Sequence, residues 1–410
     1  MKQKILYLTY DGVTDPLGRS QILPYLVGLS KCNYLIHILS FEKPGKEEDI
    51  NSVKQICEKA GISWTPLSYH KNPPVISTMY DLFILKRVAF SLAKRDGFAI
   101  IHCRSYLTSL IGRMVQRKYR IKFVFDMRGF WADERIEGNI WNKNNPVFKL
   151  IYRYFKSKEK EFIRKADHIV VLTEKARQIL KSWGRDYGVT VIPCCADAEF
   201  FDPDRISTTD RLLFRSRLGI SEHAFVLGYI GSTGTWYMLD EMLQFFHVLA
   251  SMNHEARFLL ITPNPEEPIL NKAKQNGVPP GKLIIRKAQR DEMPLYISAA
   301  DFSILFIKNT FSKQGSSATK LGESLSMGVP ALANAGVGDN DLIFQDTQIG
   351  VLLERLAPES YSEAAKKVLG WAAERDHIRR FALTNLSLDT GIKRYNSIYK
   401  EVLNGASILK

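Results

Sequence analysis

The sequence predicts an α/β protein made of two Rossmann-like, doubly wound domains that face each other across a cleft. Short apolar runs alternate with longer segments of helical period, and this alternation is typical of strand, helix, strand units in a parallel sheet. The alternation pauses near residue 200 and then starts again. A chain of 410 residues that is 45% hydrophobic also exceeds what one core usually holds, so two domains are expected.

The first half is expected to hold a series of strands, with a helix over residues 20–31 after the first of them. The strands are expected at 4–10, 36–41, 98–104, 122–128, 167–173 and the beginning of 189–203. The remainder of 189–203 ends in AEFFDP, where Asp and Pro interrupt the apolar pattern and mark a domain edge.

The second half repeats the alternation. Strands are expected at 224–231, 256–262, 282–287, 301–307 and 329–334, with helices over 240–252, 291–300 and 388–403. In doubly wound sheets, ligands bind beyond the carboxyl ends of the strands. The loops that begin GSTGTW, TPNPE, KNTFSKQGSS and NAGVGDND are therefore expected to line one cleft.

Composition narrows the class of protein. No apolar run approaches the roughly 18 residues of a membrane span, and MKQKILYLTYDGVTD turns polar too early for a signal peptide, so a cytoplasmic protein is expected. The five cysteines have no metal-ligand spacing and are expected to be buried, reduced thiols, with no metal site; they are Cys32, Cys57, Cys103, Cys194 and Cys195.

The net charge of +14 indicates anionic partners without choosing among them. Basic clusters lie near residues 85–95, 113–122 and 152–165, and the first and third mix cations with apolar side chains at helical spacing. Such helices either lie on an anionic membrane surface or simply present a solvated face. No nucleic acid is expected as a partner, because no zinc-finger, RRM, KH or basic-zipper pattern is present and the charge is not gathered in one stripe.

Two polar loops carry the strongest functional signal. Residues 231–234, GSTG, stand between an expected strand and helix, where backbone N–H groups can approach a phosphate, although a tight turn would use the same glycines. The stretch SSATKLGESLSMG places Lys320 and Glu323 on one helical face, with Lys313 nearby. Glu323 either stabilises the first turn of its own helix or accepts hydrogen bonds from a ribose, while Lys320 faces a diphosphate.

At these residues the sequence resembles the retaining glycosyltransferases of family four, which have the two-domain GT-B fold, and particularly members from bacterial surface-polysaccharide gene clusters. Four blocks occur in the family's order: YDGVTDPLGRSQILPYLVGLS, FDMRGFWADE, YIGSTGTWYMLDEML and SSATKLGESLSMGVPALANAGVGD. The resemblance implies an acceptor-side domain over 1–200 and a nucleotide-sugar-binding domain over 201–387. It also implies that a last helix, about 388–410, packs back on the first domain.

The resemblance further implies roles for individual residues. Glu323 matches the second glutamate of the family's paired-glutamate motif, which holds the donor ribose, and residues 231–234 match the loop that meets the diphosphate. Gly18, with Arg19 beside it, matches the glycine-rich loop that approaches donor and acceptor. The residues expected to bind the donor are Gly231, Ser232, Thr233, Gly234, Lys313, Ser316, Ser317, Thr319, Lys320 and Glu323.

The sequence departs from the family pattern in three places. Gly315 stands where the first glutamate of the pair is usual, so Ser316, Ser317 and Lys313 are expected on that side of the pocket. The usual arginine and lysine after the phosphate loop are missing, which leaves Lys320 and Lys313 to neutralise the phosphates. Arg128 stands in place of the family's histidine, and an arginine cannot act as a base.

The expected function is metal-independent, retaining hexosyl transfer from a nucleotide sugar to a glycan, carried on a lipid diphosphate at the inner face of the membrane, in surface-polysaccharide biosynthesis. No cofactor is expected. A departing diphosphate develops negative charge, so the site needs cations and oriented N–H groups more than a nucleophile. The expected catalytic residues are Asp126, Arg128, Asp133 and Glu134, although Asp133 and Glu134 could instead pair with Arg128 or Arg135.

Two other functions are compatible with the same residues. One is a sugar-nucleotide epimerase of GT-B architecture, which would need no acceptor. The other is a catalytically degenerate, nucleotide-sugar-binding scaffold, because one motif glutamate is absent. His102 is expected to be a structural residue at a strand end.

Overall fold

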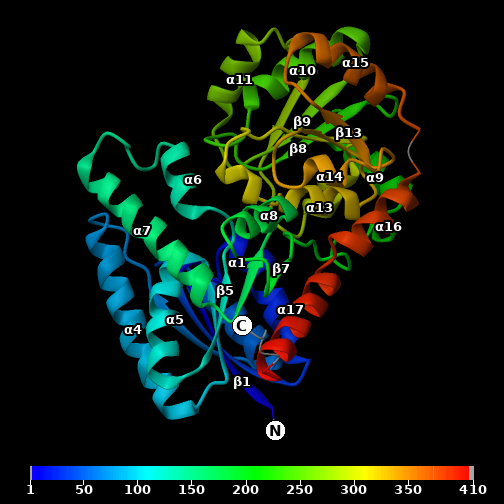
Figure 1. The fold of residues 1–410 in the computed structure, drawn as a ribbon. Coiled ribbons are helices and arrows are strands. Elements are labelled where there is room, and N and C mark those ends of the chain that lie inside the picture. Colours follow the sequence, from blue (N-terminus) through cyan, green and yellow to red (C-terminus); the bar gives the residue numbers. More distant parts are fainter. Residues whose placement is uncertain (1, 373, 406–410) are drawn as a thin grey trace. The chain divides into compact units, whose positions relative to one another are not determined.

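The computed structural model describes residues 2–372 and 374–405, which form two compact α/β units (Figure 1). The first unit is Met1–Cys195 with Leu388–Lys410, and the second is Ala196–Ser387. The chain thus leaves the first unit after Cys195, where the sequence placed the edge at residue 200, and returns to it at Leu388.

The first unit is built on a seven-stranded sheet in the order β3-β2-β1-β4-β5-β6-β7, with every neighbouring pair parallel. Its strands are β1 (Gln3–Thr9), β2 (Tyr34–Glu42), β3 (Ser63–Ser68), β4 (Ile100–Arg104), β5 (Lys122–Asp126), β6 (His168–Val171) and β7 (Val189–Val191). Its helices are α1 (Pro16–Gln21), α2 (Leu23–Ser30), α3 (Glu47–Lys59), α4 (Ile76–Asp96), α5 (Ser105–Tyr119), α6 (Trp131–Glu137), α7 (Pro146–Lys165), α8 (Glu174–Ser182) and α17 (Leu388–Leu403).

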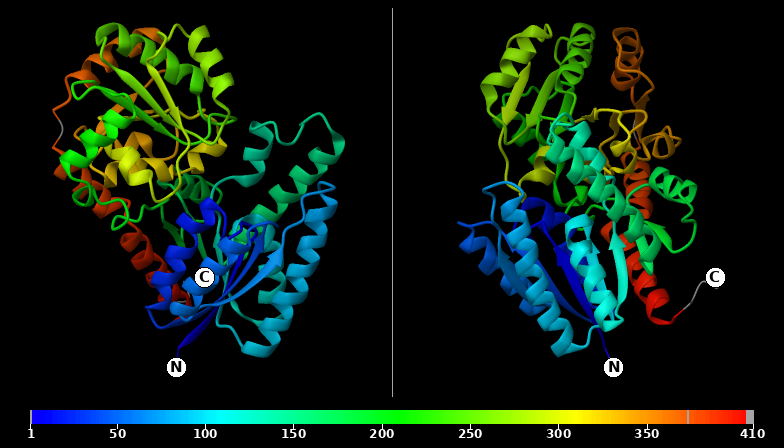
Figure 2. Two further views of the ribbon diagram at one scale, coloured as in Figure 1. Left: turned by 180° about the vertical axis from the view of Figure 1, so that it is seen from behind. Right: turned by 60° about the vertical axis from the view of Figure 1, so that its left-hand side comes forward.

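Side chains that alternate along β1 divide the core of the first unit into two layers. Leu6 and Leu8 belong to the layer that α4, α5 and α7 cover, whereas Ile5 and Tyr7 belong to the layer under α2, α3 and α17. Figure 2 shows the long cyan helices on one side of this sheet and the red helix α17 on the other. Helix α17 packs against α2, so the last helix belongs to the first unit.

The second unit has a six-stranded parallel sheet in the order β10-β9-β8-β11-β12-β13. Its strands are β8 (Val226–Ile230), β9 (Arg257–Ile261), β10 (Leu283–Arg286), β11 (Phe302–Leu305), β12 (Ala331–Asn334) and β13 (Gly350–Leu353). Its helices are α9 (Thr208–Arg217), α10 (Leu239–Met252), α11 (Glu266–Gln275), α12 (Met293–Ser298), α13 (Thr319–Ser326), α14 (Asn340–Ile343), α15 (Pro358–Leu369) and α16 (Arg375–Asn385), with short 3-10 turns η1 (Pro203–Arg205) and η2 (Ser312–Gly315).

Three local features differ from the sequence-based expectations. The helix expected over 20–31 is two helices, α1 and α2, because the chain breaks at Ile22 (φ −128°, ψ −66°) and Pro24 starts a new first turn. Strands β3 and β13 were not expected. The first is an edge strand of low apolar content that contains Pro66, and the second is a short edge strand that begins at Gly350, so neither carries a strong periodic signal.

Each sheet has one switch point, where the strand order reverses direction. It lies between β1 and β4 in the first unit and between β8 and β11 in the second. Loops that leave the carboxyl ends of such neighbouring strands diverge and create a crevice for ligands. The loop after β8 contains Gly231, and the segment after β11 leads to Lys313 and α13. None of the described helices is long and apolar enough to cross a membrane.

Candidate functional site

In the second unit, the loops after β8, β9, β11 and β12 are joined by hydrogen bonds. The Thr233 N–H donates to Asn264 Oδ1 at 2.9 Å, which ties the GSTG loop to the loop after β9. The Lys308 N–H donates to the Trp236 carbonyl at 2.9 Å, and the Gly338 N–H donates to the Lys313 carbonyl at 2.8 Å. The loops that the sequence predicted on one edge therefore form one connected, polar surface of this unit.

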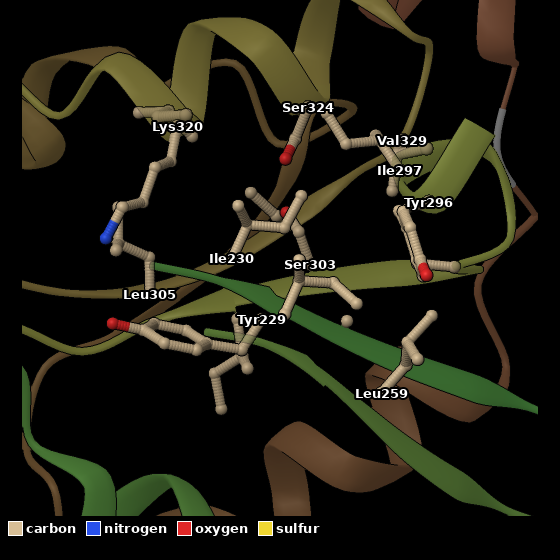
Figure 3. Close-up of a pocket in the computed structure, with 16 residues that line it drawn as sticks. Tyr229, Ile230, Leu259, Tyr296, Ile297, Ser303, Leu305, Lys320, Ser324 and Val329 are labelled. Carbon is tan, nitrogen blue, oxygen red and sulfur yellow. The ribbon is translucent and has the colours of Figure 1, made fainter. Parts of the chain in front are cut away.

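Lys320 lies at the centre of this surface. Its side chain runs from the first turn of α13 toward the sheet, and its Nζ lies on the same side as the Tyr229 hydroxyl (Figure 3). The Nζ atom is 3.6 Å from the ring centroid of Tyr237 and 5.2 Å from that of Tyr229. It is buried and has no hydrogen-bond acceptor among the described residues. A desolvated ammonium group held on aromatic faces is a strong attractor for an anion.

Burial also changes the protonation of Lys320. It lowers the pKa of the ammonium group to about 7, although the neighbouring carboxylate of Glu323 opposes this shift. The charged form is costly in this pocket because no acceptor replaces water. A diphosphate would supply such an acceptor and would favour the protonated lysine.

Gly231 has a backbone conformation that favours glycine, and Lys320 fills the space beside it. A Cβ atom at Gly231 would lie 1.9 Å from Lys320 Nζ, and the residue has φ +137°. By contrast, a Cβ at Gly234 would have no atom within 4 Å. Ser232 and Gly234 are exposed, whereas Thr233 is half-buried. The glycine at 231 is thus explained by its backbone conformation and by contact with the lysine, and the one at 234 by an open loop.

Glu323 lies one turn after Lys320 on α13. Its carboxylate is 3.9 Å from Arg290 Nη1, and its side chain is 14% exposed. Burial raises the pKa of Glu323, and the charges of Arg290 and Lys320 act in the opposite direction. Arg290 in turn lies over the rings of Phe200 and Phe201, at 5.1 and 5.8 Å. No sequence pattern pairs Arg290 with these side chains, because they lie far away from it in the chain.

Lys313 provides the second cation of the site. It lies in η2 and is nearly buried, and its Nζ is 3.9 Å from the ring centroid of Trp236. The two cations thus rest on adjacent aromatic residues, Trp236 and Tyr237. Both rings belong to the motif YIGSTGTWYMLDEML, but no sequence pattern pairs either of them with a lysine. Ser316, Ser317 and Thr319 are half-buried in the segment that joins η2 to α13, and Gly315 is buried.

In the first unit, Asp126 forms a buried ionic cluster at the carboxyl end of β5. Its Oδ2 accepts a hydrogen bond from the Tyr395 hydroxyl at 3.1 Å, and the nearest guanidinium nitrogens of Arg104 and Arg128 are 3.8 and 3.9 Å away. Burial alone would raise the pKa of Asp126, but Arg128, His102 and Arg104 together hold it below the usual range. A carboxylate stabilised in this way is a weak base and is better suited to accepting hydrogen bonds.

His102 is a structural member of the same cluster. Its Nδ1 is 2.7 Å from the Tyr399 hydroxyl, and its Nε2 is 3.6 Å from Asp126 Oδ2. Burial lowers the pKa of His102, so the ring is neutral at pH 7. Tyr395 and Tyr399 both belong to α17, and no sequence pattern pairs them with Asp126 or His102. Arg128 has φ +54°, and its Nη2 lies 3.2 Å from Cys194 Sγ.

Asp133 lies in a different network. Its two carboxylate oxygens accept hydrogen bonds from the Tyr152 hydroxyl and from Lys156 Nζ, each at 2.8 Å. These bonds join α6 to α7. The alternative that Asp133 pairs with Arg128 or Arg135 is wrong, because Lys156 supplies its cation. Glu134 follows it in the first turn of α6.

Gly18 and Arg19 lie on α1, after β1. A Cβ at Gly18 would lie 2.1 Å from the Gly12 carbonyl oxygen, so the glycine allows the helix to pack on the preceding turn. Arg19 reaches α3 and donates to Ser52 Oγ at 3.2 Å. Among the described residues, no His, Cys, Asp and Glu side chains gather in a group that could hold a metal ion. The five cysteines are free, and four of them are buried.

Comparison with solved structures identifies the fold. The glycosyltransferase from Rickettsia africae matches with a TM-score of 0.70 at 15% identity, over 98% of this chain and 99% of that chain. An Anabaena protein solved with UDP and glucose matches with a TM-score of 0.71 at 13% identity, over 97% and 99%. Sucrose-phosphate synthase from Thermosynechococcus elongatus gives 0.73 at 13% identity, over 99% and 100%. The chain therefore has the GT-B fold, as the sequence predicted.

A family model and one relative match parts of the sequence. The model of Glycosyltransferase Family 4 matches residues 28–200, which confirms the resemblance seen in the motifs. A D-inositol 3-phosphate glycosyltransferase from Nocardioides sp. is 22% identical over 313 residues, or 71% of this chain. The match spans 64% of that relative's length, which is less than two thirds.

We predict opposite outcomes for two glycine substitutions in one loop. Gly231→Ala places a methyl group on Lys320 Nζ in a strained backbone conformation, so it should destabilise the protein by about 1–3 kcal/mol and weaken nucleotide binding. Gly234→Ala should change stability by less than about 0.5 kcal/mol. Denaturant unfolding and nucleotide titrations of both variants check this. Equal behaviour of the two variants would contradict the role given to the contact with Lys320.

We also predict that donor binding depends on pH through Lys320. Above the pKa of about 7 the free lysine loses its proton, so sugar-nucleotide affinity should fall by up to about tenfold per pH unit from pH 7 to 9. The diphosphate of a sugar nucleotide has no group that titrates in this range. Isothermal titration at each pH measures the effect. Lys320→Met should bind more weakly with a flat profile, and a wild-type profile in this variant would disprove the assignment.

Proposed function

We propose that this chain is a glycosyltransferase that moves a sugar from a nucleotide-sugar donor to a glycan acceptor. The observation that carries the proposal is the buried Lys320 ammonium, which has no acceptor among the described residues and lies against Gly231 at the switch point of the second sheet. The match to Glycosyltransferase Family 4 supports the same reaction.

Each donor-site residue has a distinct task in this proposal. Lys320 and Lys313 bind the diphosphate. The N–H groups of Ser232, Gly234 and the first turn of α13 add oriented donors, whereas those of Gly231 and Thr233 already donate within the unit. Glu323 accepts hydrogen bonds from the ribose hydroxyls. Arg290, 3.9 Å from Glu323, opposes the rise in the pKa of this carboxyl that burial causes.

Transfer in this site needs charge stabilisation at the leaving group. As the bond between the sugar and the diphosphate breaks, negative charge grows on the phosphate oxygens, and two cations on aromatic faces stabilise it without moving. We propose that transfer occurs with retention and without a metal, in line with the family resemblance. Asp126, held ionised by Arg128 and Arg104, then accepts hydrogen bonds from acceptor or sugar hydroxyls and does not act as a strong base.

We further propose that the acceptor is lipid-linked and that the first unit docks on an anionic membrane from the cytoplasmic side, in surface-polysaccharide synthesis. Helix α4 supports this: Ile76, Met79 and Phe83 recur at helical spacing and are 64, 66 and 54% exposed. Lys86 and Arg87 follow on the same helix. Exposed apolar side chains beside cations are typical of helices that lie on anionic lipid.

The donor prediction is that one nucleotide class stabilises the protein through Glu323. A thermal-shift screen with UDP, GDP, ADP and dTDP and their common sugars should raise the unfolding temperature with one class, and Glu323→Ala should abolish the shift because the ribose loses its acceptor. Glu222→Ala, at an exposed glutamate of the same unit, is the control. A folded wild type that shifts with none of them would refute the proposed donor site. Turnover of a sugar nucleotide without acceptor would point to an epimerase.

The membrane prediction concerns α4. Replacing Ile76, Met79 and Phe83 by Ser should abolish sedimentation with vesicles of 30% phosphatidylglycerol, and Lys86→Glu with Arg87→Glu should weaken it at least about tenfold. Leu213→Ser, at a residue 54% exposed in the second unit, is the matched control. Lys156 is left intact because it pairs with Asp133 and Glu159. Unchanged sedimentation of both α4 variants would disprove membrane docking through this helix.

A further inference from the structure

The first unit contains a pocket away from the Asp126 cluster, and all of its lining residues belong to this unit. It has a volume of about 580 Å³, which lies in the range of small-ligand sites. One wall is the second half of α7, and the other is the connection from α8 to β7. Its lining includes four cations and one carboxylate, Lys156, Lys160, Arg164, Arg185 and Glu159.

The charges in this pocket are only partly compensated. Lys156 is engaged by Asp133 and Glu159, and Glu159 also accepts a hydrogen bond from the Tyr106 hydroxyl. Lys160 and Arg164 are exposed and, within the described part of the chain, have no carboxylate within 4.0 Å. They stand four residues apart on α7, so they lie on the same helical face. The rim of the pocket therefore carries two cations that are available to an anionic ligand.

Two aromatic side chains stand opposite these cations. Trp183 is 44% exposed and Tyr187 is 45% exposed, although large aromatic side chains are usually more buried. Both are held by neighbours: Lys156 Nζ is 5.2 Å from the Trp183 ring, and the Arg185 guanidinium is 4.2 Å from the Tyr187 ring. Arg185 itself is nearly buried and donates from Nη2 to the Ala166 carbonyl at 2.9 Å. Both rings are thus held in place, and each remains partly exposed to solvent.

We propose that this pocket binds an anionic sugar, a hexose that carries a carboxylate or a phosphate, as part of the acceptor glycan. The C–H face of a sugar ring stacks on the electron-rich face of an indole or phenol, while its acidic group pairs with Lys160 and Arg164. A flat lipid surface would reach the exposed rings but would leave the hollow between α7 and β7 unfilled.

The pocket contacts the FDMRGFWADE block, which carries the candidate acceptor residues. The Trp183 ring is 5.7 Å from the ring of Phe130, which follows Arg128 closely in the FDMRGFWADE block. Lys156 joins the pocket to Asp133 of the same block. The assignment to an acceptor rests on the proposed function, whereas binding of the anionic sugar by itself does not.

Isothermal titration calorimetry with the full chain tests the proposal, with glucuronic acid and glucose 6-phosphate as probes and glucose and inorganic phosphate as comparisons. Both acidic sugars should bind more tightly than either comparison. Lys160→Ala with Arg164→Ala should weaken them about tenfold, and Trp183→Ala should weaken them while leaving phosphate unaffected. Lys158→Ala with Lys165→Ala removes the same charge from residues of α7 that do not line the pocket.

The outcomes separate this proposal from others. Equal binding of inorganic phosphate and glucose 6-phosphate would reduce the pocket to a simple anion site and overturn the proposal. Loss of binding to vesicles of 30% phosphatidylglycerol in Trp183→Ala, with no sugar binding in the wild type, would overturn it in favour of a membrane contact. The nucleotide thermal shift of the Lys160 and Arg164 variant should equal that of the wild type. Absence of a donor shift in the wild type as well would instead refute the proposed function, whatever the sugar titrations show.

Discussion

The parallel pairing of every strand is the constraint on which the rest of this structure depends. Because all strands of a sheet point the same way, the loops that follow them meet at one edge, and the reversal of strand order opens that edge at one place. In the second unit this place lies between β8 and β11. Gly231 follows the first of these strands, and Lys313 and α13 come after the second. Residues more than eighty positions apart in the chain are thus brought to one surface.

At that surface, burial of a lysine side chain costs electrostatic free energy. Lys320 and Lys313 are held on the rings of Tyr237 and Trp236, and the Lys320 ammonium is buried without an acceptor among the described residues. Aromatic faces offset only part of the lost hydration. A folded protein that keeps a lysine in this state is prepared for an anion, because the cost of desolvating the lysine has been met before the ligand arrives.

In the first unit, the buried charged groups have partners. Asp126 is surrounded by Arg104, Arg128 and the Tyr395 hydroxyl, and Asp133 is joined to Lys156 and Tyr152. These groups are largely paired, so they stabilise the arrangement of β5, α6, α7 and α17. On the rim between α7 and the connection from α8 to β7, two cations stand beside exposed aromatic rings without carboxylate partners in the described chain. The paired charges thus stabilise the fold, whereas the cations on this rim are available to a ligand.

The sequence alone determined the fold class, most of the strands, the last helix and the segments that form the proposed donor site. These follow from local periodicity and from glycine-rich loops, which act over a few residues. It did not show β3 or β13, because an edge strand with a proline and a short edge strand that begins at a glycine have weak periodicity.

Only the tertiary structure decided the partners of the charged residues: Arg290 beside Glu323, Lys156 rather than Arg135 beside Asp133, and the rings under Lys320 and Lys313. The physical reason is that a charge is compensated by whatever folding brings within a few ångströms. Those neighbours come from strands, loops and helices that lie far apart along the chain.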